Sequence, residues 1–271
     1  MRGTNSYQRF PFPKIRRSSI DAGKLSQHKH VVHGLLEIDV SSVMSFVHTF
    51  KKEHGEKLSI TAILVHALAQ AIERHPEMHA YLDWRNRLVI FDQVNIVAMT
   101  EVDYQGTKVP VPFLFKDVNQ STLLEIHSKL RQVQASPADQ GILKQFKWFY
   151  RLPGFARRVI SRMVMKFPTY FRHYSSAVMV TPIGMFGNQP GWGIPSSTFT
   201  TTITVGSIFK KPWVVDHRIL PRDILHLTVS INHDIVDGAP ATRFVRDLVE
   251  ILQSLHSSQL ESVMGTSVPQ H

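Results

Sequence analysis

The 271-residue sequence contains no cysteine, which excludes disulfides, thiolate metal sites and a cysteine nucleophile. It has no apolar run long enough to cross a bilayer and no apolar stretch after its first arginines, so we expect neither a membrane span nor a secretory signal. The lack of cysteine fits a cytoplasmic location, because the cytoplasm is reducing. No repeat or low-complexity tract interrupts the chain, and a hydrophobic fraction of 43% is that of a folded globular protein.

Acidic residues are missing from one long segment. Residues 140–176 contain eight lysines and arginines and many aromatic residues but no aspartate or glutamate, whereas the whole chain has a net charge of +10. This basic aromatic segment therefore carries most of the excess charge, and its composition suits an anionic ligand, an acidic partner or a membrane surface. No recognised nucleic-acid-binding module accompanies the charge, so we do not expect nucleic acid as a partner.

The spacing of apolar residues predicts an α/β fold. Strands are expected at residues 29–39, 88–91, 94–100, 108–112, 177–181, 200–207, 213–215 and 224–232. Helices are expected at residues 40–54, 59–75, 121–133 and 238–255. Because strands and helices are interspersed without a strict βαβ alternation, we expect a two-layer sandwich with a mixed β-sheet and helices packed on it.

A candidate catalytic motif follows the last predicted strand. Residues 232–238 read Asn-His-Asp-Ile-Val-Asp-Gly, so that His233 lies at the end of the strand and Asp237 lies just before the closing helix. A free imidazole has a pKa near 6.5 and can take a proton from a thiol of pKa about 8.5, which makes His233 a candidate general base. Asp237 would fix the turn, and Gly238 would let the backbone bend where a side chain would collide. The alternative is that His233 is one of 15 histidines and that Asp237 only caps the helix.

The stretch 227–244, which contains this motif, resembles the catalytic domain of the dihydrolipoyl acyltransferase subunit of 2-oxo acid dehydrogenase complexes. It resembles chloramphenicol acetyltransferase more distantly. The resemblance spans residues 14–255 and is supported by the stretches 71–78, 88–91, 181–187 and 203–207. His233, Asp237 and Gly238 match the family motif, whereas Asn232 replaces its first aspartate and Asp234 its arginine. These two replacements bear on fine positioning and on the choice of partner.

The resemblance implies a chloramphenicol acetyltransferase-like fold and a role for each matching residue. His233 would be the general base, and Thr181 would donate a hydrogen bond to the oxyanion of the tetrahedral intermediate, a contribution of about 3 kcal/mol. Arg16 or Arg17 would pair with the motif aspartate. The alternative for Thr181 is a strand-end hydroxyl that opens a Thr-Pro turn, and either arginine could be an ordinary solvated charge.

The resemblance also implies ligands and partners. Coenzyme A enters as a substrate, a dihydrolipoyl thiol is the acceptor, and no metal or bound lipoyl group is needed. The family forms homotrimers in which the histidine and the hydroxyl donor come from different chains. We expect an N-terminal extension at 1–13, a catalytic domain at 14–256 with the segment 140–176 as an insertion, and a C-terminal tail at 257–271. This arrangement leaves no room for a lipoyl domain, so a lipoyl-bearing protein would act in trans.

Two alternative functions remain open. The chain could be a stand-alone O-acetyltransferase of a small molecule, or a non-catalytic trimeric scaffold or membrane-associated relative. The basic insertion could form a cationic rim that attracts the phosphates of the coenzyme, or it could contact a membrane or an acidic partner.

Other histidines could be mistaken for a site. The tripeptide Asp216, His217 and Arg218 reproduces the family's Asp-His-Arg literally, but Asp-Gly does not follow it, so we expect it in a hairpin before the last strand. Histidines at positions 28, 30 and 33, and at 75 and 79, lack carboxylates at ligand spacing, so we expect no metal site.

Overall fold

The computed structural model describes residues 8–10, 17–104, 107–135, 149, 151–184 and 189–255. Its α-helices are α1 (Arg17–Ser26), α2 (Ser41–His54), α3 (Ile60–Arg74), α4 (Leu123–Ala135), α7 (Gly154–Lys166), α8 (Pro168–Phe171) and α9 (Gly238–Ser254). Short 3-10 helices are η2 (Pro76–His79), η3 (Val118–Gln120) and η4 (Arg172–Tyr174). The strands are β1 (Val31–Asp39), β2 (Tyr81–Leu82), β3 (Leu88–Val89), β4 (Ile96–Tyr104), β5 (Thr107–Phe115), β6 (Val178–Pro182), β7 (Thr201–Val215) and β8 (Arg218–Asn232).

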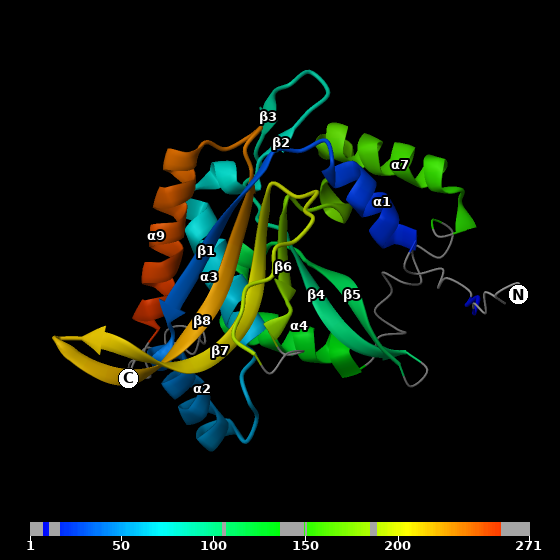
Figure 1. The fold of residues 1–271 in the computed structure, drawn as a ribbon. Helices are drawn as coiled ribbons and strands as arrows, with labels where there is room; N and C mark the ends of the chain where they lie inside the picture. The colour runs from blue at the N-terminus through cyan, green and yellow to red at the C-terminus, as the bar shows by residue number, and fades with distance from the viewer. Residues whose placement is uncertain are drawn as a thin grey trace, which may run out of the picture.

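A six-stranded mixed sheet forms the centre of the molecule (Figure 1). Its strand order is β1-β8-β7-β6-β4-β5, with β6 parallel to both β4 and β7 and the other neighbours antiparallel. A separate ribbon of β2 and β3 lies near the end of the sheet where β8 runs into α9 (Figure 1).

Helices α2, α3, α4 and α9 form a layer against one face of this sheet (Figure 1). Helix α3 is buried on nearly all sides, with ten of its residues in the interior, because its sequence is apolar around most of its circumference. Phe46 of α2 and Phe244 of α9 are each 0% exposed and join it in one core. The predicted two-layer sandwich is therefore confirmed. Among the described helices, none is both long and apolar enough to cross a membrane.

Helices α1 and α7 lie over part of the opposite face of the sheet. Ile96 and Ala98 of β4 are buried in the core with the helical layer, so the side chain of Val97 between them points the other way. Val97 lines a cavity that is also lined by Ala22 of α1 and Val164 of α7. These two helices therefore enclose space next to the sheet face that the main helical layer leaves uncovered.

Strands β7 and β8 form one long hairpin that extends beyond the rest of the sheet (Figure 1). The sequence predicts separate strands at 200–207 and 213–215, but the structure joins them into a single strand with a bulge between Val205 and Ile208. A Cβ atom on Gly206 in this bulge would lie only 2.5 Å from the carbonyl oxygen of Gly191, so glycine is required there. Asp216 and His217 form the hairpin turn with φ angles of 47° and 65°. The predicted hairpin position of this tripeptide is therefore confirmed.

Candidate functional site

The motif occupies the loop between β8 and α9. The side chain of Asn232 is buried, and its Oδ1 accepts the N–H of Asp234 at 3.3 Å. Its carbonyl oxygen accepts the N–H groups of Ile235 and Val236 at 3.1 and 3.2 Å. Val236 is 2% exposed and anchors the loop in the core. Since an aspartate at position 232 would offer the same acceptor, the change to asparagine preserves this turn.

The backbone of His233 continues the pairing of β1 with β8. Val31 pairs with Asn232, and the N–H of His233 then donates to the carbonyl oxygen of His30 at 2.7 Å. This bond fixes the point from which the imidazole leaves the sheet. The side chain of His233 is exposed at the molecular surface of the protomer, so a substrate or a second chain can reach it.

Asp237 and Gly238 begin helix α9. Asp237 has the extended backbone of an N-cap residue, with φ −77° and ψ 165°, and its carbonyl oxygen accepts the N–H of Ala241 at 3.1 Å. Its side chain makes no capping hydrogen bond within the described residues, so the structure gives the carboxylate no capping role. The prediction that a side chain at Gly238 would collide is wrong, because a Cβ atom built there meets no heavy atom within 4 Å in the described protomer.

Thr181 lies on β6, distant from His233 in the same chain. In the sheet, Thr181 pairs with Thr204 of β7, and Thr204 pairs with Thr228 of β8. His233 lies five residues beyond Thr228, about 16 Å along the strand, and two strand spacings add about 10 Å across the sheet. The two backbones are therefore about 19 Å apart, too far for one acyl group to contact both side chains.

Thr181 points away from the main helical layer. Its neighbour Val180 is buried in the core, so the alternation along β6 directs the half-buried Thr181 side chain to the opposite sheet face. Arg16 lies outside the described residues. Arg17 begins α1, but its side chain also lies outside the described part of the chain. The pairing of either arginine with the motif remains a prediction.

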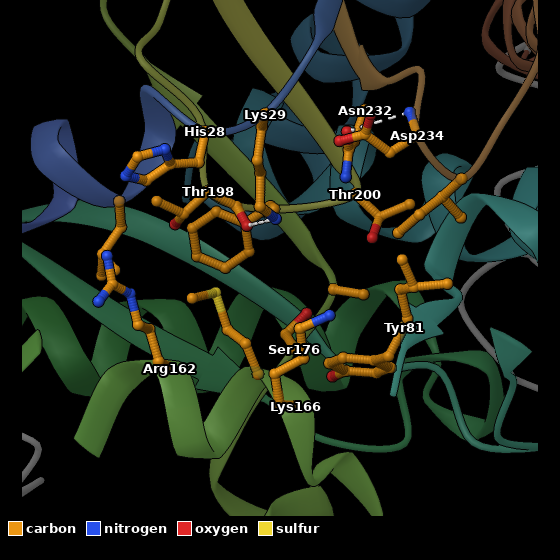
Figure 2. Close-up of a pocket in the computed structure, with 16 residues that line it drawn as sticks. His28, Lys29, Tyr81, Arg162, Lys166, Ser176, Thr198, Thr200, Asn232 and Asp234 are labelled. Carbon is orange, nitrogen blue, oxygen red and sulfur yellow. Dashed lines mark hydrogen bonds between the residues drawn. The ribbon is translucent and has the colours of Figure 1, made fainter. Parts of the chain in front are cut away.

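A cavity of about 480 Å³ lies beside the motif (Figure 2). Figure 2 shows Arg162 and Lys166 entering it from α7, opposite His28 and Lys29. The motif borders this cavity through Asn232, Asp234 and Ile235, and the remaining lining residues are Leu25, Tyr81, Leu82, Met165, Ser176, Ala177, Thr198, Phe199 and Thr200. A ligand in the cavity would therefore lie next to the loop that carries His233.

Cationic side chains outnumber anionic ones in the lining of this cavity. Burial lowers the pKa of Lys29 to about 8, and its ammonium donates a hydrogen bond to the carbonyl oxygen of Thr198. A hydrogen bond from Nδ1 of His30, 2.7 Å from the carboxylate, lowers the pKa of Asp234. Burial raises the pKa of Tyr81 to about 12, so its phenol stays protonated at neutral pH. Near pH 7 the cavity therefore offers more positive than negative charge.

The site depends on residues that the sequence pattern does not identify. Lys29 and Tyr81 lie far from the motif in sequence, and no spacing marks them as its neighbours. In the sequence, Asp234 is only a departure from the family motif, yet its carboxylate contacts His30 and borders the cavity. The pairing of β1 with the end of β8 brings Lys29 and His30 next to Asp234, and β2 adds Tyr81.

Two histidines that the sequence marks as possible metal ligands have ordinary structural partners. His33 shares a hydrogen bond with Ser230 at 2.8 Å, and His75 contacts Asp247 of α9 at 2.8 Å. Within the described ranges, no group of three or more histidine, aspartate and glutamate side chains could hold a metal ion.

Comparison with known proteins identifies the family. The sequence matches the description "2-oxoacid dehydrogenases acyltransferase (catalytic domain)" over residues 4–145 and 174–260, which is most of the chain. The chain belongs to this family. The match omits residues 146–173, so α7 and α8 lie in a segment additional to the matched parts of this acyltransferase family.

Curated relatives are distant in sequence. The lipoamide acyltransferase component of the branched-chain alpha-keto acid dehydrogenase complex of Bacillus subtilis is 24% identical over 226 residues, which are 82% of this chain and 46% of that protein. The dihydrolipoyllysine-residue succinyltransferase component of the 2-oxoglutarate dehydrogenase complex of Bartonella vinsonii is 24% identical over 227 residues, which are 82% and 47% of the two chains. This family member therefore spans about half the length of the curated relatives that it matches.

Solved structures of acyltransferases share the fold. A probable dihydrolipoamide acetyltransferase from Listeria monocytogenes superposes with a TM-score of 0.70 at 19% identity, covering 93% of this chain and 96% of that chain. The dihydrolipoamide acetyltransferase of Azotobacter vinelandii, studied for a serine, a histidine and an asparagine in its catalytic mechanism, has a TM-score of 0.71 at 16% identity and covers 97% and 96%. At these identities the likeness establishes the common fold.

Proposed function

We propose that this protein transfers an acyl group between coenzyme A and a dihydrolipoyl thiol, with His233 as the general base. The observation that carries the proposal is the position of His233. It is exposed at the end of β8, in a turn organised by Asn232, in a chain of the 2-oxoacid dehydrogenase acyltransferase family. The relatives are named as acyltransferase components, and the Azotobacter enzyme was studied for a catalytic histidine.

The proposed reaction needs one proton carrier and one hydrogen-bond donor. The neutral imidazole of His233 removes the proton from the acceptor thiol, and the resulting thiolate attacks the acyl carbonyl. The tetrahedral intermediate carries an oxyanion, to which the hydroxyl of Thr181 donates a hydrogen bond. When the intermediate collapses, the C–S bond to the departing thiol breaks, and the imidazolium returns its proton to that sulfur.

We propose that His233 and Thr181 act together across an interface between two copies of the chain. The separation of about 19 Å within one protomer supports this arrangement, because neither side chain can span it. The exposure of His233 supports it as well. A homotrimer with three equivalent interfaces would place each histidine against a neighbour's threonine.

The remaining site residues would support this arrangement. We propose that Asp237 and either Arg16 or Arg17 hold the motif loop in place. Coenzyme A would be a substrate rather than a resident group, and the lipoyl group would be presented by another protein. The absence of cysteine from the 271 residues supports action in a reducing compartment such as the cytoplasm.

Acyl transfer with two different acceptors tests the proposal. Purified protein would be given acetyl-CoA with either dihydrolipoamide or chloramphenicol, and free coenzyme A would be measured. We expect turnover with dihydrolipoamide. Turnover with chloramphenicol alone would instead show a small-molecule O-acetyltransferase. No turnover together with no binding of coenzyme A would contradict both enzymatic functions and favour the scaffold function.

A further inference from the structure

The inner face of α7 forms one wall of a second, larger cavity. This cavity has a volume of about 780 Å³, and Ile160, Ser161 and Val164 line it from α7. Ala22 of α1 and Val97 of β4 also line it, and most of its other lining side chains are apolar or aromatic. Because α7 lies between the two matched parts of the family, this wall is built by the additional segment.

The larger cavity adjoins the cavity at the motif. The two cavities share six lining residues: Leu25, Tyr81, Met165, Ser176, Thr198 and Phe199. They therefore adjoin along these residues, and we refer to the two cavities together as the α7 groove. One end borders Asn232 and Asp234, the chain neighbours of His233, which does not itself line it, and the other end is enclosed by α1, α7 and β4.

Helix α7 is fixed at both ends, so the wall of the groove is preorganised. Near its start, Nε of Arg157 donates to Asp21 of α1 at 2.7 Å, and both side chains are nearly completely buried. Arg158 adds a second bond to Asp21 at 3.0 Å. At the other end, the carbonyl oxygen of Lys166 accepts the N–H of Trp84 at 3.1 Å.

The groove has the size and polarity that an extended acyl chain requires. A twelve-carbon chain needs about 360 Å³ if each carbon unit occupies about 30 Å³, the share of one water molecule in the liquid. The 780 Å³ of the apolar end exceeds this volume. Lys29, Arg162 and Lys166 line the end near the motif, where the polar thioester end of such a donor would lie.

We infer that the α7 groove binds the apolar chain of a medium- to long-chain acyl-CoA, so that the donor is a fatty acyl thioester of about eight to sixteen carbons. This inference rests on the proposed function, because it assigns the acyl chain of that same reaction. Each methylene that leaves water strengthens binding by up to about fourfold. A long chain in this groove therefore binds much more tightly than an acetyl group.

Binding of acyl-CoA donors of different length tests the inference directly. Calorimetry would compare acetyl-CoA and dodecanoyl-CoA with the wild-type protein, with Val164→Trp, which fills the groove, and with Met163→Trp. Met163 is 49% exposed on the outer side of the same helix, so its variant is the matched control. Ser161→Leu, a smaller change on the inner face, is the second filling variant if Val164→Trp does not fold.

We expect the wild type and Met163→Trp to bind dodecanoyl-CoA at least about tenfold more tightly than acetyl-CoA. In Val164→Trp this preference should disappear, and in Ser161→Leu it should shift toward shorter chains. Equal binding of both donors by the wild type, or an unchanged preference in both filling variants, would overturn the inference.

Two further measurements separate this inference from the proposed function. Failure of all donors to be turned over with dihydrolipoamide would overturn the proposed function, whereas the binding comparison would still decide the assignment of the groove. Dodecanol tests whether an apolar acceptor uses the groove instead. If dodecanol binding, but not dodecanoyl-CoA binding, is lost in Val164→Trp, the assignment to the donor is wrong.

Discussion

Mixed assemblies of two inactive variants should regain activity if the catalytic groups come from different protomers. His233→Ala removes the proposed base, which lowers the rate by about 10² to 10⁴. Thr181→Ala removes the proposed oxyanion donor, which lowers it by about 10² to 10³. Because the two positions are about 19 Å apart in one chain, an assembly of one variant alone contains no site with both groups. A site formed by a Thr181→Ala chain, which supplies His233, and a His233→Ala chain, which supplies Thr181, would be intact.

The expected recovery follows from the composition of the mixed trimers. In a cyclic trimer that contains both variants, one of the three interfaces joins an intact histidine to an intact threonine, so about one third of the sites are intact. The two variants would be co-expressed with different affinity tags and purified through both, and coenzyme A release would be measured. Activity near one third of the wild-type value supports a shared site. Activity no higher than the average of the two separate variants would refute the reasoning.

Three further predictions concern the surroundings of the site. Asp21→Asn should lower the free energy of unfolding, measured by urea denaturation, by about 3 to 5 kcal/mol, because the buried Arg157, 4% exposed, loses its ionic partner. A decrease below about 1 kcal/mol would contradict the stabilising role of this ion pair. Burial lowers the pKa of Lys29 from its ordinary 10.5 to about 8 in the folded chain. Between these two pH values the unfolded chain binds more protons than the folded chain, so the free energy of unfolding should rise from pH 8 toward 10.5. Lys29→Met should remove this part of the rise, whereas Lys24→Met at an exposed position should keep it. A membrane contact, one of the alternative roles of the basic aromatic segment, would appear as sedimentation with anionic, but not neutral, phospholipid vesicles and would weaken in a Phe155→Ser variant; equal binding to both vesicles would contradict it.

Local chemistry made several elements predictable. Gly55 ends α2 with a left-handed backbone at φ 72°, as its position after the apolar stripe predicts. The stripe on α3 marks a buried helix, and the motif falls at the end of a strand. In each case the signal is carried by residues close together in sequence.

Long-range contacts explain what the sequence could not predict. Helix α1 is held by the ion pair of Asp21 with Arg157, which lie 136 residues apart. The α7 groove combines side chains from α1, β2, β4 and α7, and no local pattern joins these segments. At Gly238 the sequence motif predicts that a side chain would collide, but the described protomer leaves room for one. The domain limits at residues 13 and 256 remain predictions.

Comparison of His233→Ala with His217→Ala tests the central claim most directly. His217 belongs to the literal Asp-His-Arg tripeptide, but it lies in the exposed turn of the β7–β8 hairpin. Coenzyme A release from acyl-CoA would be measured for both variants after size-exclusion chromatography shows unchanged assembly. We predict that His233→Ala loses at least about 10²-fold in turnover and that His217→Ala keeps wild-type activity. Wild-type activity in His233→Ala would contradict the proposed mechanism.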